Sequence, residues 1–337
     1  MAVAARLFVK CSYAFLFLGA ALSSFVISLD FEMFWGVTDS QQIAHYGKNV
    51  AGVWIAIPEM LKIFSEFEVK CTWATVGMLI CKDYSEWMER RPALLPSYSN
   101  SKLSNYNWAQ LVRENSKLFF GRPLVKRILE TPGQELASHT YSHFFCGENG
   151  VSPDEFSADL TCAQEQFKEL GGRFESLVFP RNQARKSFIK MLPTCGFRTF
   201  RGNPGSWLYR DGHRIPGGAI GRAVRLADSW VPLSGDLMSQ ADESLGVINI
   251  PASIFLRPWS RRLAIFDDLR MNRIKAVMTQ AAISKGVCHL WWHPHNFGLN
   301  TEKNLQVLRS LLEHYRFLND KYGMRSLAMA DFTGNTV

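Results

Sequence analysis

Two histidines four residues apart, His139 and His143, follow an apolar run that ends at Ala137. This spacing lets both imidazoles reach one cation from a single helical turn. On its own, it fits a hydrogen-bonded histidine pair at a strand-to-helix turn equally well. The zincin protease motif is excluded, because it needs glutamate directly after the first histidine and Thr140 holds that position. Any general base must therefore come from another part of the chain.

Asp30 and Glu32 supply two carboxylates at the point where the first apolar run ends. Residues two apart in an extended chain point the same way. Two like charges buried together are costly unless a cation neutralises one, which favours a metal ion held by Glu32, His139 and His143. The alternative is that Glu32 is solvated in the loop of residues 33–39.

Ionisable residues also follow two further buried runs. Arg181 comes after the run that ends at Phe179, while His293 and His295 come after Trp292. Charged residues at the carboxyl ends of four different strands are typical of an α/β-barrel active site, because the strands converge there.

Short β-rich runs alternate with helical patterns, which predicts an α/β fold with mostly parallel strands, in the form of a deformed, TIM-like (β/α) barrel. A helix is predicted to begin at Asn300 or Thr301. Residues 81–130 and 202–245 break the alternation and are predicted to be two long loop insertions that shape the site. Residues 25–337 are predicted to form one domain. The predicted strands are residues 25–30, 71–76, 135–138, 176–179, 197–201, 247–250, 287–292 and 325–329.

Composition supports a globular protein. The chain has 337 residues, of which 47% are hydrophobic and 20% charged, too apolar for a disordered chain and too polar for a multi-span membrane protein. Its net charge of +8 comes from scattered residues, which argues against a nucleic-acid partner and fits an anionic small substrate or a membrane surface.

The seven cysteines contain no CxxC pair, so we expect reduced core thiols in a reducing compartment.

Residues 1–24 are predicted to be an apolar leader or anchor. Arg6 and Lys10 precede an apolar stretch from Ser12 to Leu29, as in a signal peptide or signal anchor. Cleavage near Ala20 would leave almost no chain before the first strand. A second interpretation is therefore that the translation start has been assigned too early in this sequence. We expect a cytoplasmic protein, which could associate with a membrane through this segment.

The motifs resemble those of the polysaccharide deacetylases of the NodB-homology superfamily, carbohydrate esterase family 4. In that family the first motif holds a catalytic aspartate and a metal-binding carboxylate, and the second reads His-(Ser/Thr)-x-x-His. The third contains an arginine and the last a histidine. The matching residues, in order, are Asp30, Glu32, His139, His143, Arg181 and His293.

Two motifs depart from the common pattern and leave the substrate open. The first motif is Asp-x-Glu instead of two adjacent aspartates, which resembles the branch that includes cyclic-amide hydrolases and some peptidoglycan deacetylases. The third reads Pro-Arg-Asn-Gln and lacks the aromatic residue usual in chitin and peptidoglycan deacetylases.

The resemblance implies a metal-dependent hydrolase that removes an acetyl group from an N-acetylated sugar or glycan. Zn²⁺ or another divalent metal would be held by Glu32, His139 and His143. Asp30 would accept the proton of the attacking water, and Arg181 would keep Asp30 ionised. The oxyanion would be stabilised by the metal and by a backbone N–H near Tyr141 or Ser142.

His293 would protonate the leaving amine, with His295 as the rival acid. Three other functions remain open at this stage. One is hydrolysis of a non-peptide C–N bond in a small cyclic amide, and another is an inactive carbohydrate-binding homologue. The third is a non-haem iron oxygenase with a two-histidine, one-carboxylate triad, against which the alternation of strands and helices argues. The sequence does not indicate an oligomeric state.

Overall fold

The central strand of the protein is β1 (Ser24–Phe31), all of whose residues are buried. The computed structural model describes residues 23–209 and 218–334. Within these ranges β1 pairs in parallel with β2 (Cys71–Thr75), β9 (Val287–Trp292) and β10 (Arg325–Leu327). A strand buried on both faces must be apolar almost throughout, which explains the run Phe25-Val26-Ile27.

The strands form one curled sheet in the order β6-β7-β5-β4-β3-β2-β1-β9-β8, with β10 beside the first residues of β1. Every ladder is parallel except the one between β6 and β7. The edge strands β6 and β8 form no ladder with each other in the described part of the chain, so the barrel is open on one side. The predicted deformed, mostly parallel (β/α) barrel is confirmed. The remaining strands are β3 (Gln134–Ser138), β4 (Ser176–Val178), β5 (Thr199–Arg201), β6 (Asp242–Ser244), β7 (Val247–Asn249) and β8 (Ile254–Phe255).

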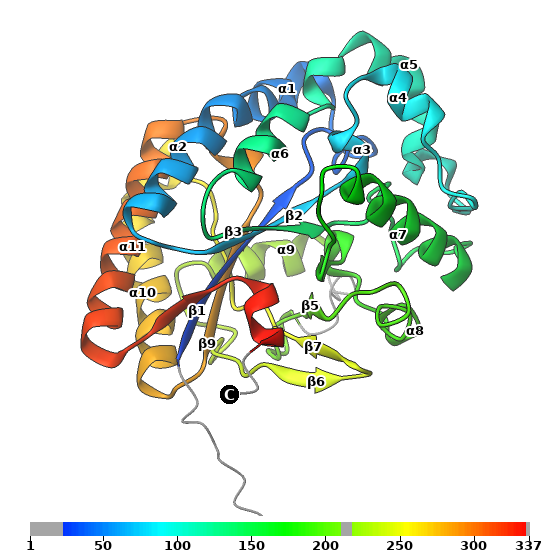
Figure 1. Ribbon diagram of the computed structural model, residues 1–337. Coiled ribbons are helices and arrows are strands. Elements are labelled where there is room, and N and C mark those ends of the chain that lie inside the picture. The colour runs from blue at the N-terminus through cyan, green and yellow to red at the C-terminus, as the bar shows by residue number, and fades with distance from the viewer. Residues whose placement is uncertain (1–22, 210–217, 335–337) are drawn as a thin grey trace, which may run out of the picture.

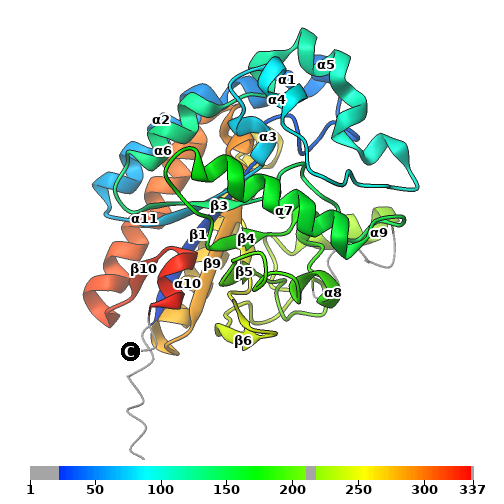
Figure 2. The same cartoon turned by 45° about the vertical axis from the view of Figure 1, so that its right-hand side comes forward.

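Helices cover the outer face of the sheet (Figure 1). Figure 2 shows β3, β4 and β5 side by side at the centre of the molecule. The predicted C-terminal helix is α11, which buries a stripe that includes Leu308, Leu312 and Tyr315. The longer helices are α1 (Ile43–Ala51), α2 (Val53–Glu66), α6 (Arg122–Leu129), α7 (Pro153–Lys168), α9 (Gly218–Ala227), α10 (Asp267–Ile283) and α11 (Thr301–Tyr322).

The first predicted insertion is built of short helices instead of open loop. These helices bury apolar residues such as Trp87 and Val112 against the barrel. The polar, proline-containing stretch at residues 96–100 is typical of a loop, so the sequence did not indicate these helices. The short helical segments are α3 (Gly77–Ile80), α4 (Tyr84–Glu89), η1 (Ser101–Leu103), η2 (Asn105–Trp108), α5 (Ala109–Glu114), η3 (Ser116–Leu118), η4 (Pro180–Asn182), α8 (Lys186–Ile189), η5 (Arg261–Phe266), η6 (Pro294–Phe297) and η7 (Met329–Thr333).

The second predicted insertion, residues 202–245, contains α9 and β6. Neither β6 nor β8 was predicted as a strand. The three residues of β6 are polar and largely exposed, and β8 has only two residues, so neither has the apolar pattern that marks a strand.

The predicted N-terminal leader or anchor, residues 1–24, falls almost wholly outside the described residues. In the described ranges no helix is long and apolar enough to cross a lipid bilayer. On this finding the predicted localisation, a cytoplasmic protein that could associate with a membrane through its N-terminal segment, is wrong. The six described cysteines are free, and five of them are buried.

Candidate active site

Glu32, His139 and His143 come together at the carboxyl ends of β1 and β3. The Glu32 Oε1 atom lies 3.1 Å from His139 Nε2 and 3.0 Å from His143 Nε2. All three side chains are buried, and their ligand atoms lie within 4.8 Å of one another. His139 Nδ1 donates to the carbonyl of Val178, which leaves the Nε2 lone pair facing Glu32. Two imidazoles and one carboxylate are a donor set suited to zinc and similar divalent ions.

The loop that carries the two histidines is not the helical turn expected from their spacing. Thr140 and His143 have φ angles of 63° and 58°, in the left-handed region that a β-branched residue such as Thr140 rarely adopts. Backbone strain of this kind persists only where surrounding contacts hold it. The two imidazoles therefore converge through an irregular turn.

The contacts that hold this turn come from Asp159, a buried residue of α7 that the sequence analysis did not single out. Its carboxyl oxygens accept the backbone N–H groups of Tyr141 (2.6 Å) and Ser142 (3.1 Å), together with the Ser142 hydroxyl. Burial raises the pKa of Asp159 to about 6, against the effect of these hydrogen bonds. The expectation that a backbone N–H near Tyr141 or Ser142 supports an oxyanion is wrong, because both groups already donate to Asp159.

Asp30 is the second carboxylate of the site, and it is paired with an arginine. The two guanidinium nitrogens Nη1 and Nη2 of Arg201 lie 2.7 and 2.8 Å from its two oxygens. Burial by itself would raise the pKa of Asp30. The charge and hydrogen bonds of Arg201, together with the charges of His139 and His293, outweigh burial and hold this pKa below its ordinary value. Arg201 also donates to Ser28 Oγ and Asn182 Oδ1, both at 2.9 Å.

Arg181, predicted to hold Asp30 ionised, pairs with another residue. Its Nη2 lies 2.6 Å from Asp39 Oδ2, and its guanidinium covers the ring of Phe145. The turn after β4 gives Arg181 and Asn182 left-handed φ angles of 54°, and it is Asn182 that contacts Arg201. The predicted Arg181–Asp30 contact is therefore wrong, and Arg201 makes it. Arg201 is the last residue of the predicted strand 197–201. The sequence analysis considered charged residues that follow a strand, and including the last residue of each strand would have identified Arg201.

His293 stands beside both carboxylates. Its Nε2 lies 3.5 Å from Glu32 Oε1 and 3.9 Å from Asp30 Oδ2. Burial tends to lower the pKa of His293, but the two negative charges outweigh it and raise this pKa. His295 stacks on His293 with ring centroids 5.0 Å apart, and burial lowers its pKa to about 3. Of the two candidate acids, only His293 is close to the carboxylates.

Aromatic residues near the site divide into core and cavity. Trp35, Phe34 and Trp292 are fully buried, and Trp35 donates its Nε1 hydrogen to the carbonyl of Phe119. Trp291 lies over the Arg201 guanidinium at 4.4 Å and lines a cavity that His293 also borders.

Comparison with known proteins finds one family model that matches part of the chain. Residues 55–200 match the sequence model of the polysaccharide deacetylase family. This match includes both histidines of the cluster and Arg181, and it ends one residue before Arg201. A search of curated proteins gave no match. This match and the motifs together support the predicted polysaccharide deacetylase (NodB-homology) superfamily.

Similar solved structures show the fold. A Mycobacterium smegmatis protein assigned to the polysaccharide deacetylases is 14% identical, with a TM-score of 0.58 over 94% of this chain and 91% of that chain. The α-amylase AmyC of Thermotoga maritima is 11% identical, with a TM-score of 0.53 over 94% and 75%. A branching enzyme of Pyrococcus horikoshii is 9% identical, with a TM-score of 0.52 over 94% and 70%. Because one fold carries several chemistries, the function must be argued from the site.

Proposed function

We propose that this protein is a metal-dependent deacetylase that removes the acetyl group from an N-acetylated sugar. The observation that carries the proposal is the buried cluster of Glu32, His139 and His143 beside the arginine-paired carboxylate of Asp30. The match of residues 55–200 to the polysaccharide deacetylase family model supports the same reaction class.

The cluster fits a divalent metal, with Zn²⁺ as the first candidate. Glu32 Oε1, His139 Nε2 and His143 Nε2 would hold it, because all three converge and His139 is already oriented through its other nitrogen. Three protein ligands leave coordination positions open, and a metal bound there polarises a carbonyl and acidifies a water.

Asp30 is the proposed general base. The Arg201 guanidinium keeps its carboxylate ionised and fixes both oxygens, so Asp30 is ready to accept a proton from the attacking water. The water oxygen adds to the acetyl carbonyl carbon and the bond from that carbon to nitrogen breaks. His293 then gives a proton to the departing amine, and acetate is the second product. The negative charges of Asp30 and Glu32 beside His293 favour its protonated form before this step.

The test combines metal content with acetate release. We expect the purified protein to carry about one zinc and to release acetate from N-acetyl sugars. Asp30→Asn should keep the metal but lower turnover ~100-fold or more, as loss of a general base does. The matched control is Asp320→Asn on the exposed face of α11. A metal-free protein, or an Asp30→Asn variant as active as wild type, would refute the proposal.

A further inference from the structure

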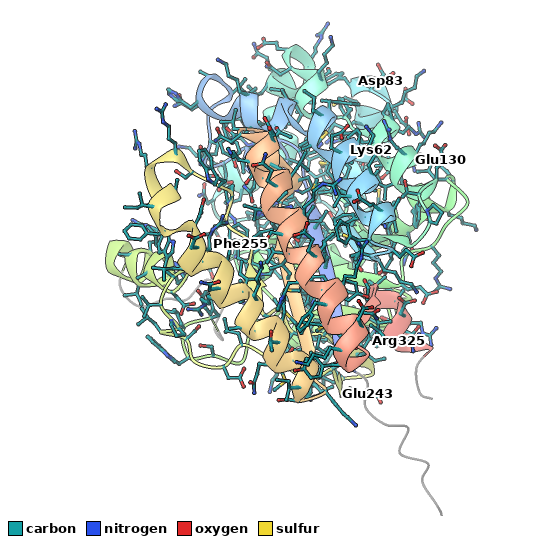
Figure 3. The ribbon with its side chains drawn as sticks, turned by 90° about the vertical axis from the view of Figure 1, so that its left-hand side faces the viewer. Lys62, Asp83, Glu130, Glu243, Phe255 and Arg325 are labelled. Carbon is teal, nitrogen blue, oxygen red and sulfur yellow. The ribbon has the colours of Figure 1, made fainter. Side chains whose placement is uncertain are left out.

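A cavity of about 280 Å³ adjoins the candidate active site. His293, Asn182 and Trp291 border it on the side of the site, and Asn182 contacts Arg201, the partner of Asp30. Phe255, labelled in Figure 3, and Ile274 of α10 form part of its apolar lining. A substrate in this cavity therefore reaches the reacting groups directly.

The cavity is rich in arginine. Of the described lining residues one is acidic, Asp228, which is 2% exposed and lies 3.0 Å from the guanidinium of Arg273. The lining arginines are Arg181, Arg225, Arg257, Arg270 and Arg273.

Two of the other four arginines have acidic partners outside the lining. Asp39 pairs with Arg181 at 2.6 Å and Asp267 pairs with Arg270 at 3.0 Å. Across residues 23–209 and 218–334, no carboxylate forms an ion pair with Arg225 or Arg257. Among the described residues, the lining therefore has two guanidinium groups without a carboxylate partner.

Arg257 is held in place by a hydrogen bond and forms no ion pair with a described carboxylate. It is half-buried, and its Nε donates to Ser229 Oγ at 2.6 Å. Its two terminal nitrogens donate to no other residue in the described ranges. Burial lowers the pKa of Arg257, which reflects the free-energy cost of a cation removed from water. A ligand anion would remove this cost.

We propose that the cavity binds a phosphate group carried by the sugar, so that the substrate is an acetylated glycosyl phosphate. This inference rests on the proposed function and narrows its substrate class. The planar guanidinium fork matches phosphate oxygens two at a time. Two guanidinium groups without a described carboxylate partner match a phosphate, whose charge at neutral pH is about −1.5 to −2, better than a single carboxylate.

Calorimetric titration of the zinc-loaded protein tests the cavity without requiring turnover. N-acetylglucosamine 1-phosphate should bind at least ~10-fold more tightly than N-acetylglucosamine, and Arg225→Gln and Arg257→Gln should each remove most of that difference. Arg222→Gln, on the exposed face of the same helix α9, is the matched control and should keep it. Arg225 makes no hydrogen bond to a described residue, so its variant should fold, which thermal unfolding checks.

Equal affinity for the two sugars, or a preference that both arginine variants retain, would overturn the inference, since the phosphate would then bind elsewhere, for example at the metal. Acetate release is measured separately on four substrates: the sugar phosphate, a nucleoside diphosphate sugar, a polyprenyl diphosphate sugar and a neutral chitin oligomer. The preferred phosphate substrate identifies the carrier, whereas equal kcat/KM on the neutral oligomer would overturn the substrate class. No acetate from any substrate, with arginine-dependent phosphate binding intact, would refute deacetylation but support the phosphate site.

Discussion

The two halves of the sheet are built differently. In the first half β1, β2, β3 and β9 have five to eight residues each and are paired along most of their length. In the second half β4, β5, β6 and β7 have three residues each, and the long segment 202–245 follows β5. The first half carries Asp30, Glu32, His139 and His293, while the second carries Arg201. The arginine-lined cavity is bordered by His293 at the end of the first half and by residues of the long segment 202–245 of the second.

This difference separates two requirements of one site. Reacting groups must be held within fractions of an ångström, and long buried strands with complete ladders provide that rigidity. Substrate recognition needs space and varied side chains, which short strands and long connections provide. We therefore expect changes in the first half to affect metal binding and chemistry, and changes in the second half to affect charge and substrate preference.

The largest effect is expected for Glu32→Ala, in the long-stranded half. Loss of one of three ligands should empty the metal site and reduce acetate release by ~10³-fold or more, since the metal supplies several kcal/mol of transition-state stabilisation. Metal analysis and an acetate assay measure both effects. His45→Ala, an exposed histidine on α1, should change neither. A Glu32→Ala protein that keeps its metal would mean that Glu32 is not a ligand.

His293→Ala tests the general acid at the end of β9. An amine is a poor leaving group and needs the proton, whereas an activated phenolate does not. The variant should therefore lose ~100-fold on an N-acetyl sugar and much less on 4-nitrophenyl acetate. Rates on the two substrates are compared in the same preparation. Equal losses on both would show that His293 positions the substrate or supports the fold.

Arg201→Met tests whether the short-stranded half controls the base. Asp30 is active when ionised, and Arg201 holds its pKa low, so activity is lost as the pH falls through that pKa. Without Arg201 the pKa rises, and the acidic limb of the pH–rate profile should move to higher pH while turnover falls ~10 to 100-fold. Arg181→Met is the control and should leave the limb unchanged, because Arg181 pairs with Asp39. If Arg181→Met shifts the limb and Arg201→Met does not, the assignment is reversed.

Gly36→Ala should give the smallest effect on zinc affinity. It tests whether the packing around Glu32 is tighter than the packing after β5. A Cβ at Gly36 would lie 2.0 Å from Glu32 Oε2, so the carboxylate must move. We expect zinc affinity to fall ~10-fold with the fold retained, as for changes to groups that support a ligand. Gly205, after β5, has no atom within 4 Å of such a Cβ, so Gly205→Ala should leave zinc affinity unchanged. Equal affinities in both variants would contradict tight packing around Glu32.

Sequence alone was sufficient to locate the described strands other than β6 and β8, and to identify the residues at the ends of the long ones. Buried parallel strands are continuous apolar runs, and parallel strands bring their carboxyl ends to one edge, so Asp30, Glu32, His139, His143 and His293 could be expected near one another. Their local pattern also carried the family resemblance, which the comparison with known proteins bears out.

Only the tertiary structure decided which group partners which. Arg201 and Asp30 are 171 residues apart, and their contact depends on the curl of the sheet, which no local pattern encodes. Arg181 looked equivalent in sequence, but the left-handed turn after β4 directs it to Asp39. Asp159 holds the histidine loop from a helix that follows it in the chain, and Arg225 and Arg257 meet at the cavity from separate segments. The sequence shows which side chains carry a charge. Which opposite charge each of them pairs with depends on contacts between residues that are far apart in the chain.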